Sequence, residues 1–496
     1  MTESALTQCR PSWLNWSRTQ RIGPQYVAKP RSLPELRELM RQVEARGGQL
    51  KPVATGLSFS DILQTEDTLV ETTSLVGGRA EDVLLPREEE LWLEPHPPEP
   101  LVRIPCGARI RPLNAALAQL GLAFTNLGGY DNQTIVGAIS TSTHGSGIGL
   151  PPLPDAVRSL DLLAVGGEYY RIEPTRGLTD PAKFKARYPE RKLLQSDSSF
   201  WPCVVSLGCM GIITSVTMEV SRAFLLQETV RLRRWSVVKP RLQSRDAMPA
   251  VRNYEVLLNP YRRRDGDYDC LVTERNVAPA GAKPRPLPPA RRSLESTTFL
   301  ASTQRELLQL MERQPRLIPG LLRAGFEALE THGGPHIDES FVVYNVGKIN
   351  TADVMSGEYF FPMANGQLVA AVEALLALVE RNCRQGIYQP SPLALRFVRH
   401  SRAPLSMAFG EAHGAVEIAC FSGLPYAAEA LLSYEALCQE HRGRPHWGQM
   451  HELTGQPGWL QSAYPGANEW LQAYQRFNRT GLFNNHFTDR LGISQP

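Results

Sequence analysis

Two segments rich in Gly, Ser and Thr most constrain what this chain can fold into. They span residues 54–61 and, about seventy residues later, 128–147. Such runs present many backbone N–H groups, and glycine lets a ligand approach them closely, which suits a pyrophosphate. Ordinary turns share this composition, so the residues alone leave both interpretations open. The glycines of 145–149 lack G-x-G-x-x-G spacing, which disfavours a Rossmann site for NAD.

The first 220 residues alternate helical and strand patterns. Ser32 and Pro34 precede apolar residues at helical spacing and predict the start of a helix. A strand over 160–165 is expected to pair with the apolar run 169–172 across Gly166 and Gly167. These patterns predict an α+β domain that ends near residue 222.

The remaining residues predict a second α+β domain. A chain of 496 residues exceeds the size at which one core keeps growing, so two or more units are expected. Pro, Ala and Arg dominate residues 276–292, which indicates an exposed loop rather than a site. The strand-like segments are 254–258, 340–346, 358–363, 394–398 and 416–421, and the helix-like segments are 303–313, 368–382 and 426–438.

Charge and cysteine usage limit the partners. A net charge of +3 gives no basic field for a nucleic acid, so none is expected as a partner. The eight cysteines show neither C-x-x-C pairs nor metal-ligand spacing, which predicts free thiols and no metal site. No secretion signal or membrane span is visible, and a cytoplasmic location is expected.

The two glycine segments resemble the flavin-binding signature of the vanillyl-alcohol-oxidase superfamily, in particular its aldonolactone and alditol oxidase branch. Segments 206–213, 358–362 and 445–448 match that branch in the same order. The resemblance implies a two-domain α+β flavoprotein. A PCMH-type FAD-binding domain would span 1–224, a substrate or cap domain 225–450, and the segment 451–496 would return to the FAD-binding domain.

The resemblance also implies FAD as the cofactor. Leu57 stands where many relatives carry the histidine that attaches FAD covalently, so noncovalent FAD is expected. Gly128 stands at the position beside the flavin that controls O2 access, and without a Cβ it predicts O2 as the acceptor; a turn glycine is the alternative. The implied cofactor contacts are Thr55, Gly56, Leu57, Ser58, Ser60, Gly128, Gly129, Gln133, Thr134, Gly137, Ser140, Thr141, His144, Gly145, Gly211 and Ile213.

The substrate side departs from the branch. Its Glu-x-Arg pair reads Ala394 to Arg396 here, and Gln449 replaces the Lys that follows H-W-G. A polyol would bind weakly without those polar groups, which predicts a non-sugar, partly apolar substrate. Arg396 could stabilise negative charge on the flavin or hold a carboxylate.

Two further residues complete the catalytic candidates. His446 is an acid/base candidate because an unperturbed pKa near ~6.5 suits proton transfer, with a structural role as the alternative. Tyr359 could donate a hydrogen bond to substrate or simply pack. Arg399 and His400 are weaker candidates, because strand alternation puts at most one of them on the face of Arg396.

These residues predict an FAD-dependent oxidase that moves a hydride from a small-molecule substrate to flavin N5 and forms H2O2 from O2. The retained arginine without its glutamate favours oxidative decarboxylation of a carboxylic acid in secondary metabolism. The alternatives are an aldonolactone- or alditol-type alcohol oxidase or dehydrogenase, and a flavin-binding protein without catalysis. The oligomeric state stays open.

Overall fold

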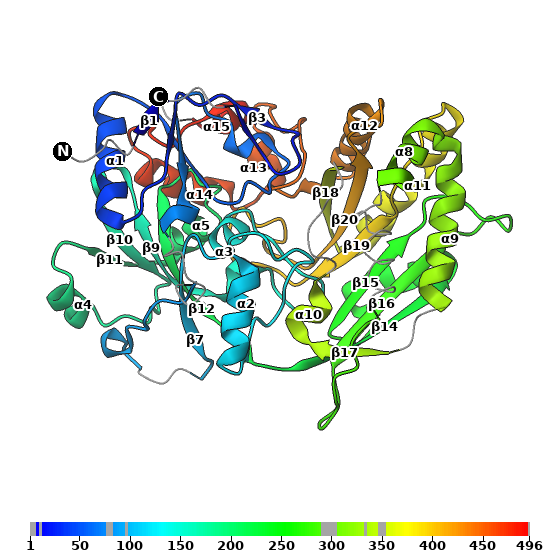
Figure 1. The fold of residues 1–496 in the computed structure, drawn as a ribbon, viewed down its shortest axis with the longest axis horizontal. Helices are drawn as coiled ribbons and strands as arrows, with labels where there is room; N and C mark the ends of the chain where they lie inside the picture. The colour runs from blue at the N-terminus through cyan, green and yellow to red at the C-terminus, as the bar shows by residue number, and fades with distance from the viewer. Residues whose placement is uncertain are drawn as a thin grey trace.

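The computed structural model describes residues 6–8, 12–75, 83–94, 98–288, 305–331, 335–345 and 354–494. Two bodies lie side by side: an N-terminal body coloured blue to teal, and a second body coloured green to orange (Figure 1). The last helices, in red, lie on the N-terminal body (Figure 1). This arrangement of helices and sheets confirms the predicted α+β class.

A small sheet and helix α1 (Leu33–Ala45) form one part of the N-terminal body. Ser32 caps α1 by accepting a hydrogen bond from the backbone N–H of Glu35, and Pro34 lies in the first turn, as predicted. The apolar face of α1 packs on the sheet, and each fully buried side chain of this kind contributes roughly 1.5–3 kcal/mol. The sheet contains, in spatial order, β1 (Leu6–Gln8), β4 (Tyr26–Ala28), β6 (Thr68–Glu71) and β5 (Leu50–Val53).

A second sheet supports the middle of the N-terminal body. Its strands β9 (Val157–Leu163) and β10 (Tyr169–Glu173) pair antiparallel on either side of Gly166 and Gly167, which confirms the predicted hairpin. Helices α2 (Ile110–Gln119), α3 (Ile135–Ser140) and α5 (Asp197–Val204) contribute buried residues to the same core. The sheet contains, in spatial order, β11 (Lys192–Gln195), β10 (Tyr169–Glu173), β9 (Val157–Leu163), β12 (Ile212–Glu219) and β7 (Leu101–Pro105).

The second body is built on one antiparallel sheet, which has eight strands in the described part of the chain. Helices α11 (Gln367–Arg384) and α12 (Ala427–Glu440) share a core with one face of it. The opposite face turns toward the N-terminal body (Figure 1). In spatial order the strands are β17 (His336–Glu339), β14 (Leu225–Arg234), β16 (Asp269–Val277), β15 (Asn253–Leu258), β19 (Leu393–Val398), β20 (His413–Phe421), β18 (Val354–Pro362) and β21 (Arg444–Pro445).

One predicted strand is wrong. Residues 340–346 were expected to be extended, but helix α10 (Ser340–Tyr344) occupies most of this segment, and residue 346 lies outside the described residues. The neighbours Val343 and Tyr344 are both buried, which a strand with one solvated face does not allow. A short apolar run cannot be distinguished from a buried helical turn by periodicity.

Two other elements complete this body. Helices α8 (Arg305–Arg313) and α9 (Ile318–Thr331) follow the Pro-rich segment. Within that segment β16 extends to Val277 and residues 278–288 form a loop, while 289–292 lie outside the described residues. The seven cysteines in the described ranges are free, and no helix among these residues is long and apolar enough to span a membrane.

The C-terminal helices α13 (Trp459–Ala463), α14 (Ala467–Phe477) and α15 (His486–Arg490) contact the N-terminal body. Trp470 packs in its core and donates a hydrogen bond to the carbonyl of Val205 at 2.8 Å. Asn485, the cap of α15, donates to the carbonyls of Ile62 and Gln64 at 3.0 and 2.9 Å. The chain end therefore holds the segment that follows the first glycine run.

Candidate functional site

A large cavity separates the N-terminal body from the eight-stranded sheet. It contains about 2210 Å³ of space between atoms, including the solvent at its mouth. On one side are loops and helix ends within residues 54–58, 128–144 and 206–213, which we call the cradle. On the other are side chains of β18, β19 and β20, which we call the strand wall: Ser356, Glu358, Ala394, Arg396, Glu417 and Ala419.

The cradle brings together the predicted cofactor contacts. All of them line the cavity except Ser60 and Gly145. Ser60 donates its hydroxyl hydrogen to the carbonyl of Trp447 at 2.7 Å, and the Gly145 carbonyl faces Nδ1 of His144 at 2.8 Å. These two residues fasten the cradle rather than face the cavity.

Backbone geometry explains two of the cradle glycines. Gly56 has a φ of +63°, and a Cβ there would collide with the ring of Trp13. Gly211 has a φ of +134°, and its Cβ would lie 2.6 Å from the carbonyl oxygen of Leu163. Only glycine meets both demands without strain, so the backbone stays open to the cavity.

The cradle fits FAD on grounds of its own. Thr143 Oγ1 and Gln449 Oε1 are buried polar atoms on the cavity lining, and neither has a hydrogen-bond partner within the described residues. Buried polar atoms are normally paired, so the Thr143 hydroxyl can donate to or accept from a bound group, and Gln449 Oε1 can accept a hydrogen bond from one. Together with glycine-rich backbone and the hydroxyls of Thr55 and Ser58, they suit a cofactor with a pyrophosphate and polar ring edges.

Sequence reasoning missed Lys51, which lines the cavity beside the cradle. Its side chain is 1% exposed and lines the cavity, and Nζ donates to the carbonyls of Leu207 at 2.9 Å and Gly208 at 3.3 Å. The ammonium group thus joins β5 to the loop before β12. A basic residue inside an otherwise apolar strand was the available signal.

Strand alternation selects the side chains of the strand wall. On β19, Ala394 and Arg396 line the cavity, whereas Leu393, Leu395 and Phe397 belong to the core under α11 and α12. The period of two residues is that of a strand with one face packed and one face open. Arg396, the predicted catalytic arginine, is therefore brought to the cavity.

The same alternation places Tyr359 away from the cavity. Its neighbour Glu358 points to the strand wall, while Tyr359 is 1% exposed in the core beneath the helices. Burial raises the pKa of the Tyr359 hydroxyl well above its usual range. Arg399 and His400 are also absent from the residues that line the cavity, and His400 is exposed.

Two carboxylates hold Arg396. Its Nη1 lies 2.7 Å from Glu417 Oε2 and 3.3 Å from Glu358 Oε1. Burial alone would lower the pKa of Arg396, but these two glutamates raise it. Its Nε and Nη2 have no partner within the described residues, and the side chain is 19% exposed toward the cavity. The guanidinium therefore offers a donor edge in a fixed orientation.

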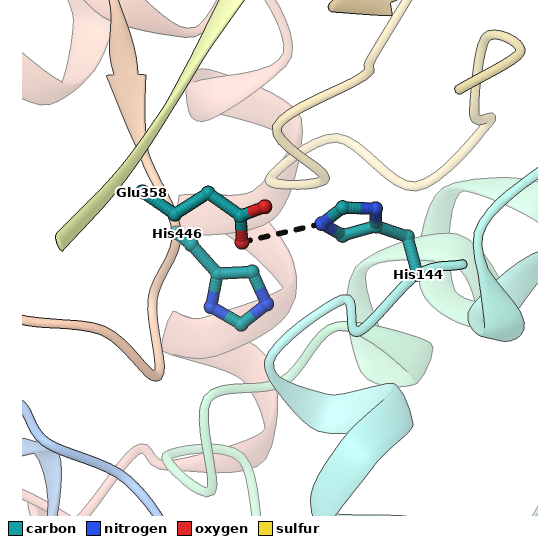
Figure 2. A group of neighbouring side chains, drawn as sticks. All are labelled: His144, Glu358 and His446. Atoms are coloured by element: carbon teal, nitrogen blue, oxygen red, sulfur yellow. Dashed lines mark hydrogen bonds and ion pairs between the residues drawn. The ribbon is translucent and has the colours of Figure 1, made fainter. Parts of the chain in front are cut away.

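His144 extends this charged group (Figure 2). Its Nδ1 faces the Gly145 carbonyl at 2.8 Å, and its Nε2 faces Glu358 Oε2 at 3.3 Å. Burial alone would raise the pKa of Glu358, but His144 and Arg396 lower it to about 2. Glu358 is therefore a carboxylate within an ion-pair network.

His446 completes the group and is held neutral. Burial lowers its pKa to about 4. Its Nδ1 accepts a hydrogen bond from the Gly448 N–H at 3.0 Å, so the ring hydrogen resides on Nε2. One ring nitrogen of His144, one ring nitrogen of His446 and one carboxylate oxygen of Glu358 lie within 4.8 Å of one another. An Nε2 that carries hydrogen cannot bind a metal ion, so this trio suits hydrogen bonding rather than metal ligation.

The structure corrects the expected chemistry of the pocket. The substitution of glutamate by Ala394 predicted a more apolar pocket, yet Glu358 and Glu417 supply two carboxylates from neighbouring strands. Glu417 lies directly across the ladder from Ala394. Sequence reasoning named the segment of Glu358 but selected Tyr359, and it overlooked Glu417, because cross-strand register is not visible in a single sequence.

Comparisons with known proteins place these features in context. Residues 216–491 match the family described as D-arabinono-1,4-lactone oxidase, and residues 24–173 match the family described as FAD binding domain. The L-gulono-1,4-lactone dehydrogenase of Mycobacterium tuberculosis is 25% identical over 482 residues, covering 97% of this chain and 99% of that protein. The L-gulonolactone oxidase of Scyliorhinus torazame is 22% identical, and the match covers 96% of this chain and 97% of that protein.

Solved structures agree on the fold. Cholesterol oxidase from B. sterolicum superposes with a TM-score of 0.77 at 14% identity, covering 99% of this chain and 98% of that chain. This likeness supports a PCMH-type FAD-binding domain with a second α+β domain. Taken together, the matches favour the alternative of an aldonolactone-type oxidase or dehydrogenase over the oxidative decarboxylase that the sequence favoured.

Proposed function

The chain belongs to the D-arabinono-1,4-lactone oxidase family and is an FAD-dependent oxidoreductase, and from this premise we propose that it oxidises a hydroxyl-bearing carbon of an aldonolactone-type substrate. The observation that carries the proposal is the donor edge of Arg396, fixed by Glu358 and Glu417 at the cavity face. A hydroxyl or carbonyl oxygen fits that edge.

The strand wall supplies the groups that the reaction needs. When bound, FAD supplies the acceptor for the two electrons that leave the substrate carbon. Arg396 holds the substrate oxygen, and Nε2 of the neutral His446 donates a second hydrogen bond from the cavity lining. Glu417 accepts the hydroxyl proton: one of its oxygens faces Arg396 and the other accepts from Ser356 at 3.2 Å, which leaves lone pairs unused.

The same wall disfavours a carboxylic acid. Arg396 is already paired with the carboxylates of Glu358 and Glu417. A substrate carboxylate would be a third negative group beside this one arginine, and both glutamates would repel it. A neutral hydroxylactone avoids this repulsion. The acceptor included in the proposal is O2, because Gly128 lines the cavity and presents no side chain to it.

Anaerobic flavin reduction tests the proposal. The purified flavoprotein is mixed with L-gulono-1,4-lactone or D-arabinono-1,4-lactone in the absence of O2. We expect loss of the visible flavin absorbance, and its return together with H2O2 when air is admitted. Absence of bleaching by both lactones would contradict the substrate class, and bleaching without reoxidation in air would instead favour a dehydrogenase.

A further inference from the structure

The strand wall is divided along one row of paired residues. Glu358 pairs with Glu417, Glu417 with Ala394, and Ala394 with Leu257 in successive antiparallel ladders. Directly paired residues project from the same face of a sheet. The row therefore changes from two carboxylates to two hydrocarbon side chains across the width of the cavity.

The apolar end of the row is enclosed. Leu257 pairs with Leu271, and Phe326 and Leu329 of α9 pack against both. The hydrocarbon surface thus continues into a small buried core rather than ending at solvent. Leu257 and Ala394 line the cavity, together with Pro392, which comes directly before β19.

Among the described residues, the apolar end offers a ligand no polar side chain that lacks a partner of its own. Ser391, which also lines the cavity there, uses its hydroxyl on the backbone carbonyl and N–H of Ala419 at 2.9 and 3.3 Å. A polar ligand group placed against Leu257, on the side of Ala394 away from Glu417, would lose its hydrogen bonds to water without replacement, which is unfavourable. Hydrocarbon placed there would lose only contact with water, which is favourable.

The apolar end of the row lies close to Arg396, where the substrate oxygen is expected to bind. Ala394 and Arg396 are two residues apart on one face of β19, a separation of about 7 Å along a strand. A substrate oxygen on the donor edge of Arg396 therefore has carbon atoms within reach of Ala394. The methyl side chain of Ala394 leaves room that a longer side chain would fill.

We propose that this recess, formed by Leu257, Pro392 and Ala394, binds a hydrocarbon part of the substrate. The substrate class, which rests on the proposed function, is then an aldonolactone-type hydroxylactone that carries an apolar substituent. Its hydroxyls face Glu417 and Arg396, and its substituent faces Leu257.

A matched pair of lactones tests this inference. L-Gulono-1,4-lactone and its 5,6-O-isopropylidene derivative differ by an apolar cap on the two side-chain hydroxyls and keep the ring hydroxyls free. We expect kcat/KM for oxidation of the lactone in air to be about ten-fold or more higher for the capped lactone, since each buried methylene contributes about a four-fold gain.

Two variants assign the preference to the recess. Ala394→Leu fills it and is expected to bring the ratio of the two kcat/KM values close to one. Ala394→Ser is almost the same size and adds a hydroxyl, so it is the conservative partner should the larger variant not fold, and it is expected to lower the ratio several-fold.

The outcomes separate the inference from the proposed function. If both lactones reduce the flavin with equal efficiency, the recess does not select hydrocarbon and the inference is overturned while the proposed function stands. A preference that survives both Ala394 variants also overturns it. If neither lactone reduces the flavin, the proposed function itself is overturned, and the substrate class inferred here falls with it.

Discussion

The two sides of the cavity recognise their ligands in different ways. The cradle presents backbone and small hydroxyl side chains from loops, so its chemistry depends on the path of the chain. The strand wall presents Glu358, Arg396 and Glu417 from three adjacent strands, so its chemistry depends on charge and register. A change in backbone shape should therefore damage the first, and a change in charge should damage the second.

The largest effect is expected from Arg396→Ala. The variant removes the donor edge and leaves Glu358 and Glu417 without their shared cation, so the rate of flavin reduction should fall about a hundred- to a thousand-fold. The FAD content should stay unchanged, because Arg396 belongs to the strand wall. Stopped-flow reduction and the FAD-to-protein ratio measure the two effects.

Arg396→Lys is the matched control for charge. It keeps the cation without the planar fork, and we expect only partial recovery of the rate. If either variant lost FAD in proportion to activity, the two sides of the cavity would not be separable.

Gly211→Ala changes the cradle and leaves the charges of the strand wall unchanged. The new Cβ would lie 2.6 Å from the Leu163 carbonyl at a φ of +134°, which should destabilise the protein by about 1–3 kcal/mol and lower its FAD content. Gly23→Ala is the control, because no atom lies within 4 Å of a Cβ there. Thermal unfolding of the two variants measures the difference, and equal melting temperatures would refute this account of the cradle.

The pH dependence of stability tests whether His446, beside the strand wall, is buried in its neutral form. Burial lowers the pKa of His446 from 6.5 to about 4, so its contribution to stability is present above pH 6.5 and is lost as the pH falls toward 4. Within that window we expect a decline of about 1.4 kcal/mol per pH unit from this residue. His446→Gln should show a shallower decline in melting temperature between pH 6.5 and 4.5. An unchanged slope would mean that His446 is not a buried neutral histidine.

The smallest effect concerns the cofactor linkage. Leu57 lines the cradle and has no nucleophilic nitrogen, and the ring nitrogens of His144 face Gly145 and Glu358. Acid precipitation of the holoprotein should therefore leave a colourless pellet and all of the FAD in the supernatant. Flavin retained on the pellet would show a covalent bond that the cradle does not explain.

Much of the cradle could be predicted because its signals are local. Ser32 and Pro34 mark the start of α1, and the two glycine segments carry nearly all of the cavity-lining cofactor contacts that were expected. Backbone recognition is encoded by residues that are neighbours in the chain, so a single sequence reveals it.

The strand wall could be predicted only in part. Arg396 was found from a motif, but Glu417 acts from the opposite strand, and its partner Ala394 suggested that the carboxylate was missing. The choice of Tyr359 over Glu358 failed for a related reason, because the face that a strand residue takes depends on the sheet around it. Charge networks assembled across strands require the register before they can be seen.

The anchoring of the first glycine segment by α15 bears on how the protein is made. Asn485 clamps the carbonyl of Ile62 across 423 positions of sequence, and Arg490 pairs with Asp61 at 2.6 Å. Contacts between such distant residues form late, because the intervening chain must first be ordered. During synthesis on the ribosome, residues 54–62 emerge long before residues 485–490 do. We therefore expect the protein to hold FAD firmly only after α15 has been synthesised.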